Sequence, residues 1–137
     1  MRAVVDTNIL FAALVSRRAI LREAFLVEAK VSLFAPRFLF VELFKHQHRI
    51  IAATGLPKDE LLDFLHGLLM RIRFVDEGAI PIGIWMEARR LCRDIDEKDT
   101  PFVALTLHVD GQLWTEDEAL KEGLRNKGFT RFYEPGP

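Results

Sequence analysis

Three acidic residues of this sequence lie where strands of a sheet are expected to end and helices to begin. Asp6 follows an apolar pair, Asp99 directly precedes the Thr-Pro start of a helix, and Asp117 lies two residues beyond a short apolar strand. Proteins with an open parallel sheet bind ligands in the crevice beyond the carboxyl ends of the strands, so these carboxylates are candidates to share one pocket. Each also has an ordinary interpretation, because Asp commonly caps the start of a helix.

Glu42 is a candidate of a different kind. It is the only charged residue between Phe38 and Phe44, in a helical segment that is apolar all round. A buried carboxylate without a partner is costly, so Glu42 needs a cation nearby. That cation is either a metal ion or an Arg from a neighbouring helix, and the sequence leaves both open.

Two acidic segments, 94–99 and 116–118, contain several acids each, and only some of these are candidate metal ligands. In the first, Asp96 is a further candidate ligand that could instead brace its loop, and the acids at positions 94 and 97 are expected in solvent. In the second, Asp117 is favoured because it lies in the first turn of the next helix, although Glu116 could compete for the same role.

A cluster of these carboxylates predicts a divalent metal site. Two carboxylates about 4 Å apart repel each other by roughly 4 kcal/mol at an effective dielectric constant near 20. Three or four of them would raise one another's pKa values unless a cation joined them. Oxygen ligands without Cys or paired His select Mg²⁺ or Mn²⁺ over Zn²⁺. Such ions orient phosphates and activate water, which is phosphodiester chemistry.

Alternating strand and helix patterns must bring these acids together. The strand candidates are Arg2–Val5, Val31–Ala35, Arg73–Val75, Gln112–Trp114 and Arg131–Tyr133. The helix candidates are Thr7–Val15, Ile20–Ala29, Pro36–Ala53, a helix opened by Pro57, Ile84–Arg93, a helix opened by Thr100-Pro101, and Asp117–Asn126. This alternation predicts an α/β fold, a three-layer α/β/α arrangement around a central parallel sheet of about five strands.

These motifs resemble the PIN-domain family, which includes the VapC-type ribonucleases of toxin–antitoxin pairs. The resemblance spans nearly the whole chain and rests on Val4-Val5-Asp6-Thr7-Asn8, Glu42, the segment 96–105 and Leu113-Trp114-Thr115-Glu116-Asp117. The family implies that the metal-holding acids are Asp6, Glu42, Asp99 and Asp117, with Asn8 and Thr115 as polar support. It also implies five parallel strands, commonly a homodimer, and for a toxin a small antitoxin that binds across the crevice.

Basic residues near the acids are candidates to contact RNA. Lys45, His46 and Arg49 fall on the same predicted helix face as Glu42, where they could guide a phosphate backbone to the metal or form a solvated face. Arg17 and Arg18 lie in or near the gap between the first two predicted helices and could grip phosphates or remain solvated.

Composition limits the kinds of binding site and cross-link that this chain can have. With 19 basic and 20 acidic residues the formal charge is −1, so binding of nucleic acid by bulk electrostatics is not expected. Cys92 is the only cysteine, which excludes an intramolecular disulfide. His46 and His48 diverge on a helix and are interpreted as surface histidines.

Length and apolar content predict one domain over residues 1–137, without repeats or linkers. The longest apolar run, Ile9–Val15, is too short to span a bilayer, and the first residues lack the pattern of a signal peptide. A soluble, cytoplasmic protein is therefore expected.

The sequence thus predicts a Mg²⁺- or Mn²⁺-dependent endoribonuclease, with the toxin of a toxin–antitoxin pair as one such role. An alternative is a non-catalytic RNA-binding or assembly module that retains the acidic pocket. A phosphatase with an aspartyl nucleophile is disfavoured, because that chemistry usually places a second Asp two residues after the first, and here that residue is Asn8.

Overall fold

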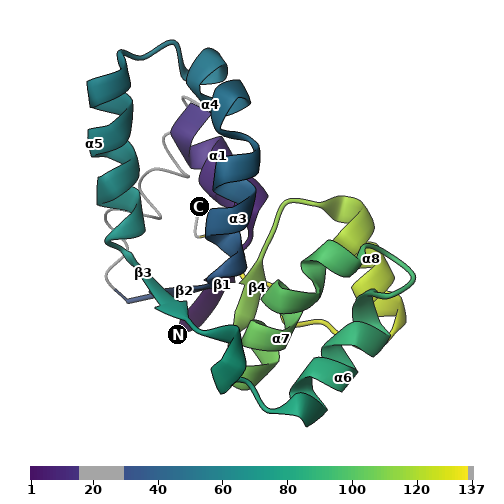
Figure 1. Ribbon diagram of the computed structural model, residues 1–137. Coiled ribbons are helices and arrows are strands. Elements are labelled where there is room, and N and C mark those ends of the chain that lie inside the picture. The colour runs from purple at the N-terminus through teal and green to yellow at the C-terminus, as the bar shows by residue number, and fades with distance from the viewer. Residues whose placement is uncertain (16–29, 136–137) are drawn as a thin grey trace.

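A central parallel sheet organises the computed structural model, which describes residues 1–15 and 30–135 (Figure 1). Its strands are β1 (Arg2–Val5), β2 (Ser32–Pro36), β3 (Ile72–Val75) and β4 (Gln112–Trp114), in the order β3-β2-β1-β4. In register, Val4 of β1 lies beside Phe34 on one side and Leu113 on the other. β1 is therefore a central strand, which explains why its residues 3–5 are apolar and fully buried.

Helices flank the sheet, as the α/β prediction required. They are α1 (Thr7–Val15), α3 (Phe38–Lys45), α4 (Gln47–Thr54), α5 (Lys58–Leu69), α6 (Ile82–Cys92), α7 (Thr100–His108) and α8 (Glu118–Asn126), with the 3₁₀ turns η1 (Glu77–Ala79) and η2 (Glu97–Asp99). Figure 1 shows α1, α3, α4 and α5 in one group and α6, α7 and α8 in another, with the strands between them. The predicted helix Ile20–Ala29, together with Arg17 and Arg18, lies outside the described residues.

The predicted fifth strand, Arg131–Tyr133, is reduced to a single parallel bridge, so the sheet has four strands within the described residues. The Leu113 N–H donates to the Arg131 carbonyl over 2.8 Å, and the Tyr133 N–H donates to the Leu113 carbonyl over 2.9 Å. Pro135 follows two residues later and has no N–H with which to extend the ladder.

The predicted helix Pro36–Ala53 is wrong at its start. Pro36 is the last residue of β2, and α3 begins only at Phe38. The first amides of this helix are satisfied from a distance: Glu77 Oε1 accepts from the Arg37 N–H over 2.9 Å, and Glu77 Oε2 accepts from the Phe38 N–H over 3.1 Å. A carboxylate 39 residues away in sequence thus caps the helix that carries Glu42.

The same predicted helix is also interrupted in the middle. His46 separates α3 from α4, with φ −108° and ψ 12°, outside the helical region. Its ring packs edge-on against Phe11 of α1, with 5.7 Å between the ring centroids. The break therefore coincides with a contact to α1, which a periodicity argument about one helix does not contain.

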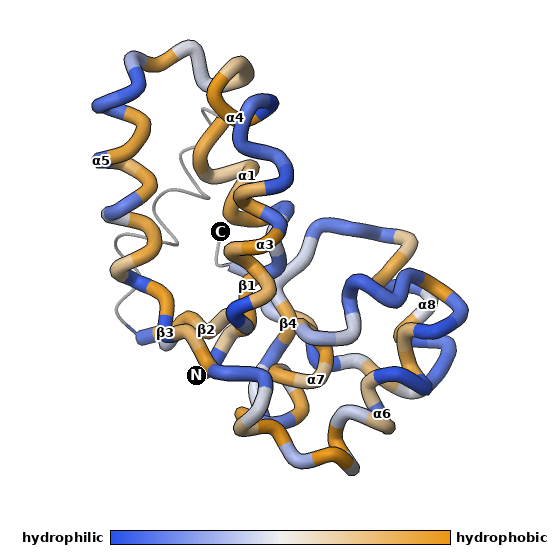
Figure 2. The backbone as a smooth tube through the Cα atoms, viewed as in Figure 1, coloured by the Kyte–Doolittle hydropathy of each residue, from blue (hydrophilic) through white to orange (hydrophobic). Residues whose placement is uncertain are grey.

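The core lies between the sheet and the inner faces of the helices. Its largest fully buried side chains include Trp114, Leu10, Leu33, Leu39 and Leu105. Figure 2 shows the hydrophobic stretches on the central strands and on α3, and hydrophobic residues alternating with hydrophilic ones along α5. None of the helices in the described ranges is both long enough and apolar enough to cross a bilayer.

Candidate active site

A pocket of about 120 Å³ lies beyond the carboxyl ends of β1 and β4. The chain runs from β1 outward to β2 and β3 on one side and returns to β4 on the other, so this is the point where the strand order reverses. Both groups of helices contribute to the walls. The lining residues are Asp6, Thr7, Asn8, Phe11, Glu42, His46, Arg49, Asp96, Lys98, Asp99, Phe102 and Asp117.

Asp6 is the most buried of the acids, with 5% of its surface exposed. Its Oδ1 accepts a hydrogen bond of 2.8 Å from the Ile9 N–H, so Asp6 caps α1 as well as lining the pocket. Burial raises its pKa to about 6 in spite of hydrogen bonds from Thr115 and Ile9, and the charges of Asp117 and Glu116 add to the increase. The two interpretations of Asp6, helix cap and pocket acid, are therefore both realised.

Asp99 lies at the junction of η2 and α7, so the predicted helix start after it is right. The expected strand before it is wrong, because the connection that carries Asp99 comes from α6. Its pKa is raised to about 7, first by burial and then by the charges of Asp96, Asp6, Asp117 and Glu42. Four acids from other positions in the chain thus act on this one carboxylate. The convergence of like charges that the sequence suggested is present in the fold.

Asp117 and Asp6 are joined through Thr115, which is 1% exposed. The Asp117 N–H donates to Thr115 Oγ1 over 3.1 Å, while the Thr115 side chain hydrogen-bonds to Asp6. Asp117 Oδ1 in turn accepts from the Leu120 N–H over 3.1 Å and caps α8. Glu116 does not line the pocket, so the geometry favours Asp117 of the two acids.

Glu42 reaches the pocket from α3 and is half-buried, less enclosed than its apolar neighbours suggested. Its Oε1 accepts a hydrogen bond of 3.0 Å from Thr7 Oγ1. Within residues 1–15 and 30–135, no Lys or Arg forms an ion pair with Glu42, Asp6, Asp99 or Asp117. The alternative of an arginine partner for Glu42 therefore has no support in this part of the chain.

The donor set fits a hard divalent cation by its chemistry, because every acid offers oxygen and their mutual repulsion calls for positive charge. Yet among the residues described, no three acidic, His or Cys side chains already stand close enough to hold a metal ion. Several acids direct an oxygen to a protein donor instead, as Asp96 does in accepting from the Lys98 N–H over 3.0 Å. Metal binding would therefore require side-chain adjustment.

The other predicted site residues divide into three groups. Asn8, Arg49 and Asp96 line the pocket, and Thr115 lies behind it. Lys45 is exposed and does not line it. The arginines at positions 17 and 18 are not among the described residues.

Five lining residues were not predicted as site residues: Thr7, Phe11, His46, Lys98 and Phe102. A signal existed for His46, which follows Glu42 by four positions and so shares its helix face. Its interpretation as a surface histidine holds only in part, since it is half-buried in the pocket wall. No comparable spacing identifies the two phenylalanines as pocket residues.

Comparisons with known proteins agree with this architecture. A family model of the PIN domain matches residues 4–132. A chain in the crystal structure of VapBC2 from Rickettsia felis, bound to a DNA fragment from its promoter, is similar in structure, with a TM-score of 0.69 and 17% sequence identity. The similarity covers 89% of this chain and 92% of that one, and at this identity it establishes a shared fold. No curated protein sequence matches at a significant level.

Proposed function

This chain belongs to the PIN-domain family, and from that premise we propose that it is a Mg²⁺- or Mn²⁺-dependent endoribonuclease. PIN domains are typically nucleases that use divalent metal ions. The observation that supports the proposal most is the mutual influence of the acids: Asp6 and Asp117 both act on Asp99 within one pocket. A hydrolase of phosphodiester bonds has use for such a site, because a bound cation would offset both the acids' repulsion and the charge of a phosphate.

The metal-holding residues in this proposal are Asp6, Glu42, Asp99 and Asp117, with Asp96 as a further candidate. A divalent ion bound there supplies the positive charge that stabilises the phosphate and favours ionisation of water. Thr7 orients Glu42, and Thr115 orients Asp6 and Asp117, through the hydrogen bonds described above. Their role is to hold the carboxylates in place before substrate arrives.

Substrate contacts in this proposal come from the polar and basic part of the same wall. Arg49 and Lys98 offer charge to phosphate oxygens, and Asn8 offers an amide. Phe11 and Phe102 give the pocket apolar borders that limit water. The chain has no overall basic excess, so RNA binding rests on these local groups and on the bound cation.

The similarity to VapBC2 supports a toxin role with an antitoxin partner. In this proposal a small antitoxin covers the acidic pocket and blocks RNA from the metal. Growth arrest on expression of the chain alone, relieved by co-expression of a small protein encoded beside it, is the expected result. Arrest that persists with Asp6→Asn would count against a nuclease toxin.

Cleavage of RNA by the purified chain tests the nuclease proposal directly. Cleavage is expected with Mg²⁺ or Mn²⁺ and not with EDTA. Asp6→Asn should lower the rate by about 100-fold or more, because it removes a charged ligand. The amide oxygen of Asn can still cap α1, so the fold should survive and the loss should report the missing charge.

Asp59→Asn is the matched control, since Asp59 is an exposed acid in the first turn of α5, outside the pocket. It should leave the rate unchanged. RNA binding without cleavage under any divalent ion would favour the non-catalytic alternative instead. Full activity of the Asp6→Asn protein would reject the proposed site.

A further inference from the structure

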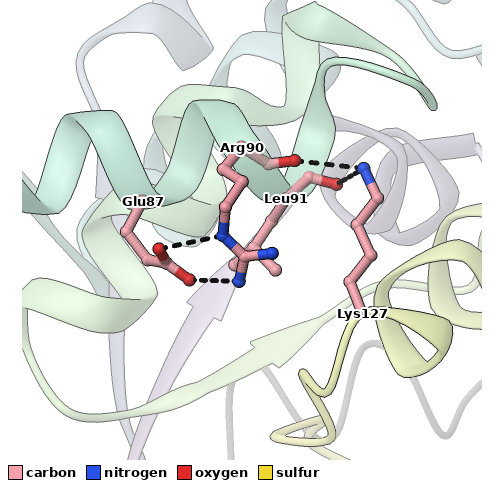
Figure 3. A network of polar contacts seen from close by, with 4 residues as sticks. All are labelled: Glu87, Arg90, Leu91 and Lys127. Atoms are coloured by element: carbon pink, nitrogen blue, oxygen red, sulfur yellow. Dashed lines mark hydrogen bonds and ion pairs between the residues drawn. The ribbon is translucent and has the colours of Figure 1, made fainter.

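The acidic loop that carries Asp96 and Asp99 is attached at its start to the far end of α8. Lys127, the first residue after α8, donates through Nζ to the carbonyls of Arg90 over 3.0 Å and Leu91 over 3.2 Å (Figure 3). These carbonyls belong to the last turn of α6, where helix carbonyls lack partners within the helix. Nζ also pairs with Asp94 Oδ2 at 3.0 Å, so Lys127 holds both the end of α6 and the start of the loop.

A second attachment lies one helical turn earlier. Ile95 packs so closely on Gly123 of α8 that a Cβ at position 123 would lie 2.6 Å from Ile95 Cδ1 and 2.8 Å from Cγ1. Real Cβ atoms do not approach other carbons this closely, so any side chain at position 123 would displace Ile95 from where it lies. Gly123 and Lys127 are four residues apart and therefore share a helix face, which is the face that the loop contacts.

These two contacts join the two segments that bring Asp99 and Asp117 to the pocket. α8 begins with its cap Asp117 in the pocket and ends at Lys127, and the loop begins at Asp94 and ends with Asp99 in the pocket. We propose that Ile95, Gly123 and Lys127 form a clamp that fixes Asp96 and Asp99 relative to Asp117 and so sets the affinity of the pocket for a divalent cation. The metal-dependent part of this inference rests on the proposed function.

The physical need for a clamp follows from the charges in the pocket. Asp99 is repelled by the carboxylates of Asp96, Asp6, Asp117 and Glu42, which favours outward movement of its loop. No ion pair with a described Lys or Arg holds Asp99 in place. The attachments at residues 94 and 95 lie only a few residues before Asp99 and act against this movement.

Two substitutions test the clamp in the full-length chain. Gly123→Ala forces Ile95 to move, and Lys127→Met keeps the apolar stem while removing the ammonium group. Mn²⁺ affinity, measured by the electron paramagnetic resonance signal of free Mn²⁺, should fall by about 10- to 100-fold in each variant. Amide hydrogen exchange of residues 94–99 should become faster in both variants, with exchange in α7 unchanged.

The controls make comparable changes outside the clamp. Gly67→Ala adds a methyl group to another helical glycine, with nothing within 4 Å of the new Cβ. Glu87→Gln removes the 2.6 Å ion pair with the Arg90 side chain, which lies beside the Lys127 contacts in Figure 3 but does not take part in them. Both controls should keep wild-type Mn²⁺ affinity and exchange. In an Ile95→Ala background, Gly123→Ala should have no further effect, because the clashing atoms are gone.

Wild-type Mn²⁺ affinity and wild-type exchange at residues 94–99 in Gly123→Ala and Lys127→Met would overturn the clamp. The clamp would also be overturned if the variants lost thermal stability but kept wild-type Mn²⁺ affinity. Affinity is to be measured well below the unfolding temperature of each variant. If Gly123→Ala does not fold, Lys127→Met decides the question alone. A wild-type chain that neither binds Mn²⁺ nor cleaves RNA would reject the proposed function, and exchange at 94–99 would still decide whether Ile95 and Lys127 hold the loop.

Discussion

Thr7 Oγ1 lies 3.0 Å from Glu42 Oε1 and donates a hydrogen bond to it. Thr7 directly follows Asp6 after β1, while Glu42 belongs to α3, so this bond holds Glu42 to the segment that carries Asp6. The Thr115 hydroxyl bonds to the Asp6 carboxylate and accepts from the backbone N–H of Asp117. Each of these neutral hydroxyl groups therefore fixes one acidic side chain to the segment of another acid, and they provide the first experimental target.

Thr7→Val should weaken Mn²⁺ binding by about tenfold, because Glu42 loses the donor that orients it. Val keeps the shape of Thr, and the free energy of unfolding should fall by about 1–2 kcal/mol for a lost hydrogen bond to a carboxylate. Mn²⁺ titration and urea unfolding measure the two effects. Thr106→Val is the control, since Thr106 is also buried but donates to the Phe102 carbonyl of its own helix. An equal loss of Mn²⁺ affinity in both variants would contradict a specific role for Thr7.

The stability of the metal-free protein should decrease as pH rises. The folded-state pKa values of Asp6 and Asp99, about 6 and about 7, lie above their ordinary value of 3.8. The folded state therefore holds these protons more tightly, and the resulting stabilisation is full below pH 3.8 and lost as pH rises through about 6 to 7. For Asp6, the difference between 3.8 and about 6 corresponds to roughly 3 kcal/mol. Urea unfolding in EDTA across this pH range measures the loss of stability.

Asp6→Asn separates this effect from other titrating groups. In EDTA near pH 8 the variant should be more stable than the wild type, and near pH 3.5 the two should be about equally stable. Added Mg²⁺ should stabilise the wild type and not the variant, since ligand binding favours the folded state that binds it. A wild type that gains stability between about pH 4 and 7 would contradict the raised pKa values.

Glu77 should influence the site from outside it. Glu77→Ala removes both acceptors of the first α3 amides and is expected to lower the free energy of unfolding by about 1–2 kcal/mol. Because α3 carries Glu42, RNA cleavage should fall as well. Glu77→Gln, which keeps one oxygen acceptor, should recover part of both losses. Activity unchanged in a clearly destabilised Glu77→Ala protein would show that the position of α3 is not critical.

Arg49 and Lys45 give a paired test of the route taken by RNA. Arg49 lines the pocket and Lys45 does not. Arg49→Gln should raise KM for single-stranded RNA more than it lowers kcat, and it should reduce the slope of log affinity against log salt by about 0.7. Lys45→Gln should change neither quantity appreciably. Equal effects of both substitutions would indicate diffuse electrostatic attraction instead of a contact at the pocket.

Local patterns were enough to predict the elements nearest to the acids. The bounds of β1, α1 and β4 match those expected from apolar runs and helical spacing. Asp6 was identified because strand-to-helix junctions in a parallel sheet face one crevice. Asp99 was identified from its position before the Thr-Pro start of α7, although the segment that precedes it is η2 and not a strand. Asp117 emerged from the same reasoning as Asp6, and its N-cap geometry explains why an acid is well placed there.

Features that depend on long-range contacts were not predictable in this way. The start of α3 is determined by Glu77, which is remote in sequence, and the break at His46 coincides with its contact to Phe11. The prediction of a fifth strand was wrong because only one bridge forms beside Leu113. Intrinsic preferences of a short segment contain none of these interactions, so tertiary contacts overrode them.

The pocket takes its walls from positions 6, 42, 99 and 117, which span most of the chain. A cut in the exposed connection between α4 and α5, near residues 55–57, would separate the first two acids from the last two. Neither fragment would then contain all four acids of the proposed site. If the proposed site binds a divalent ion, recovery of cation binding on mixing the two pieces would report their reassembly, as in a split reporter.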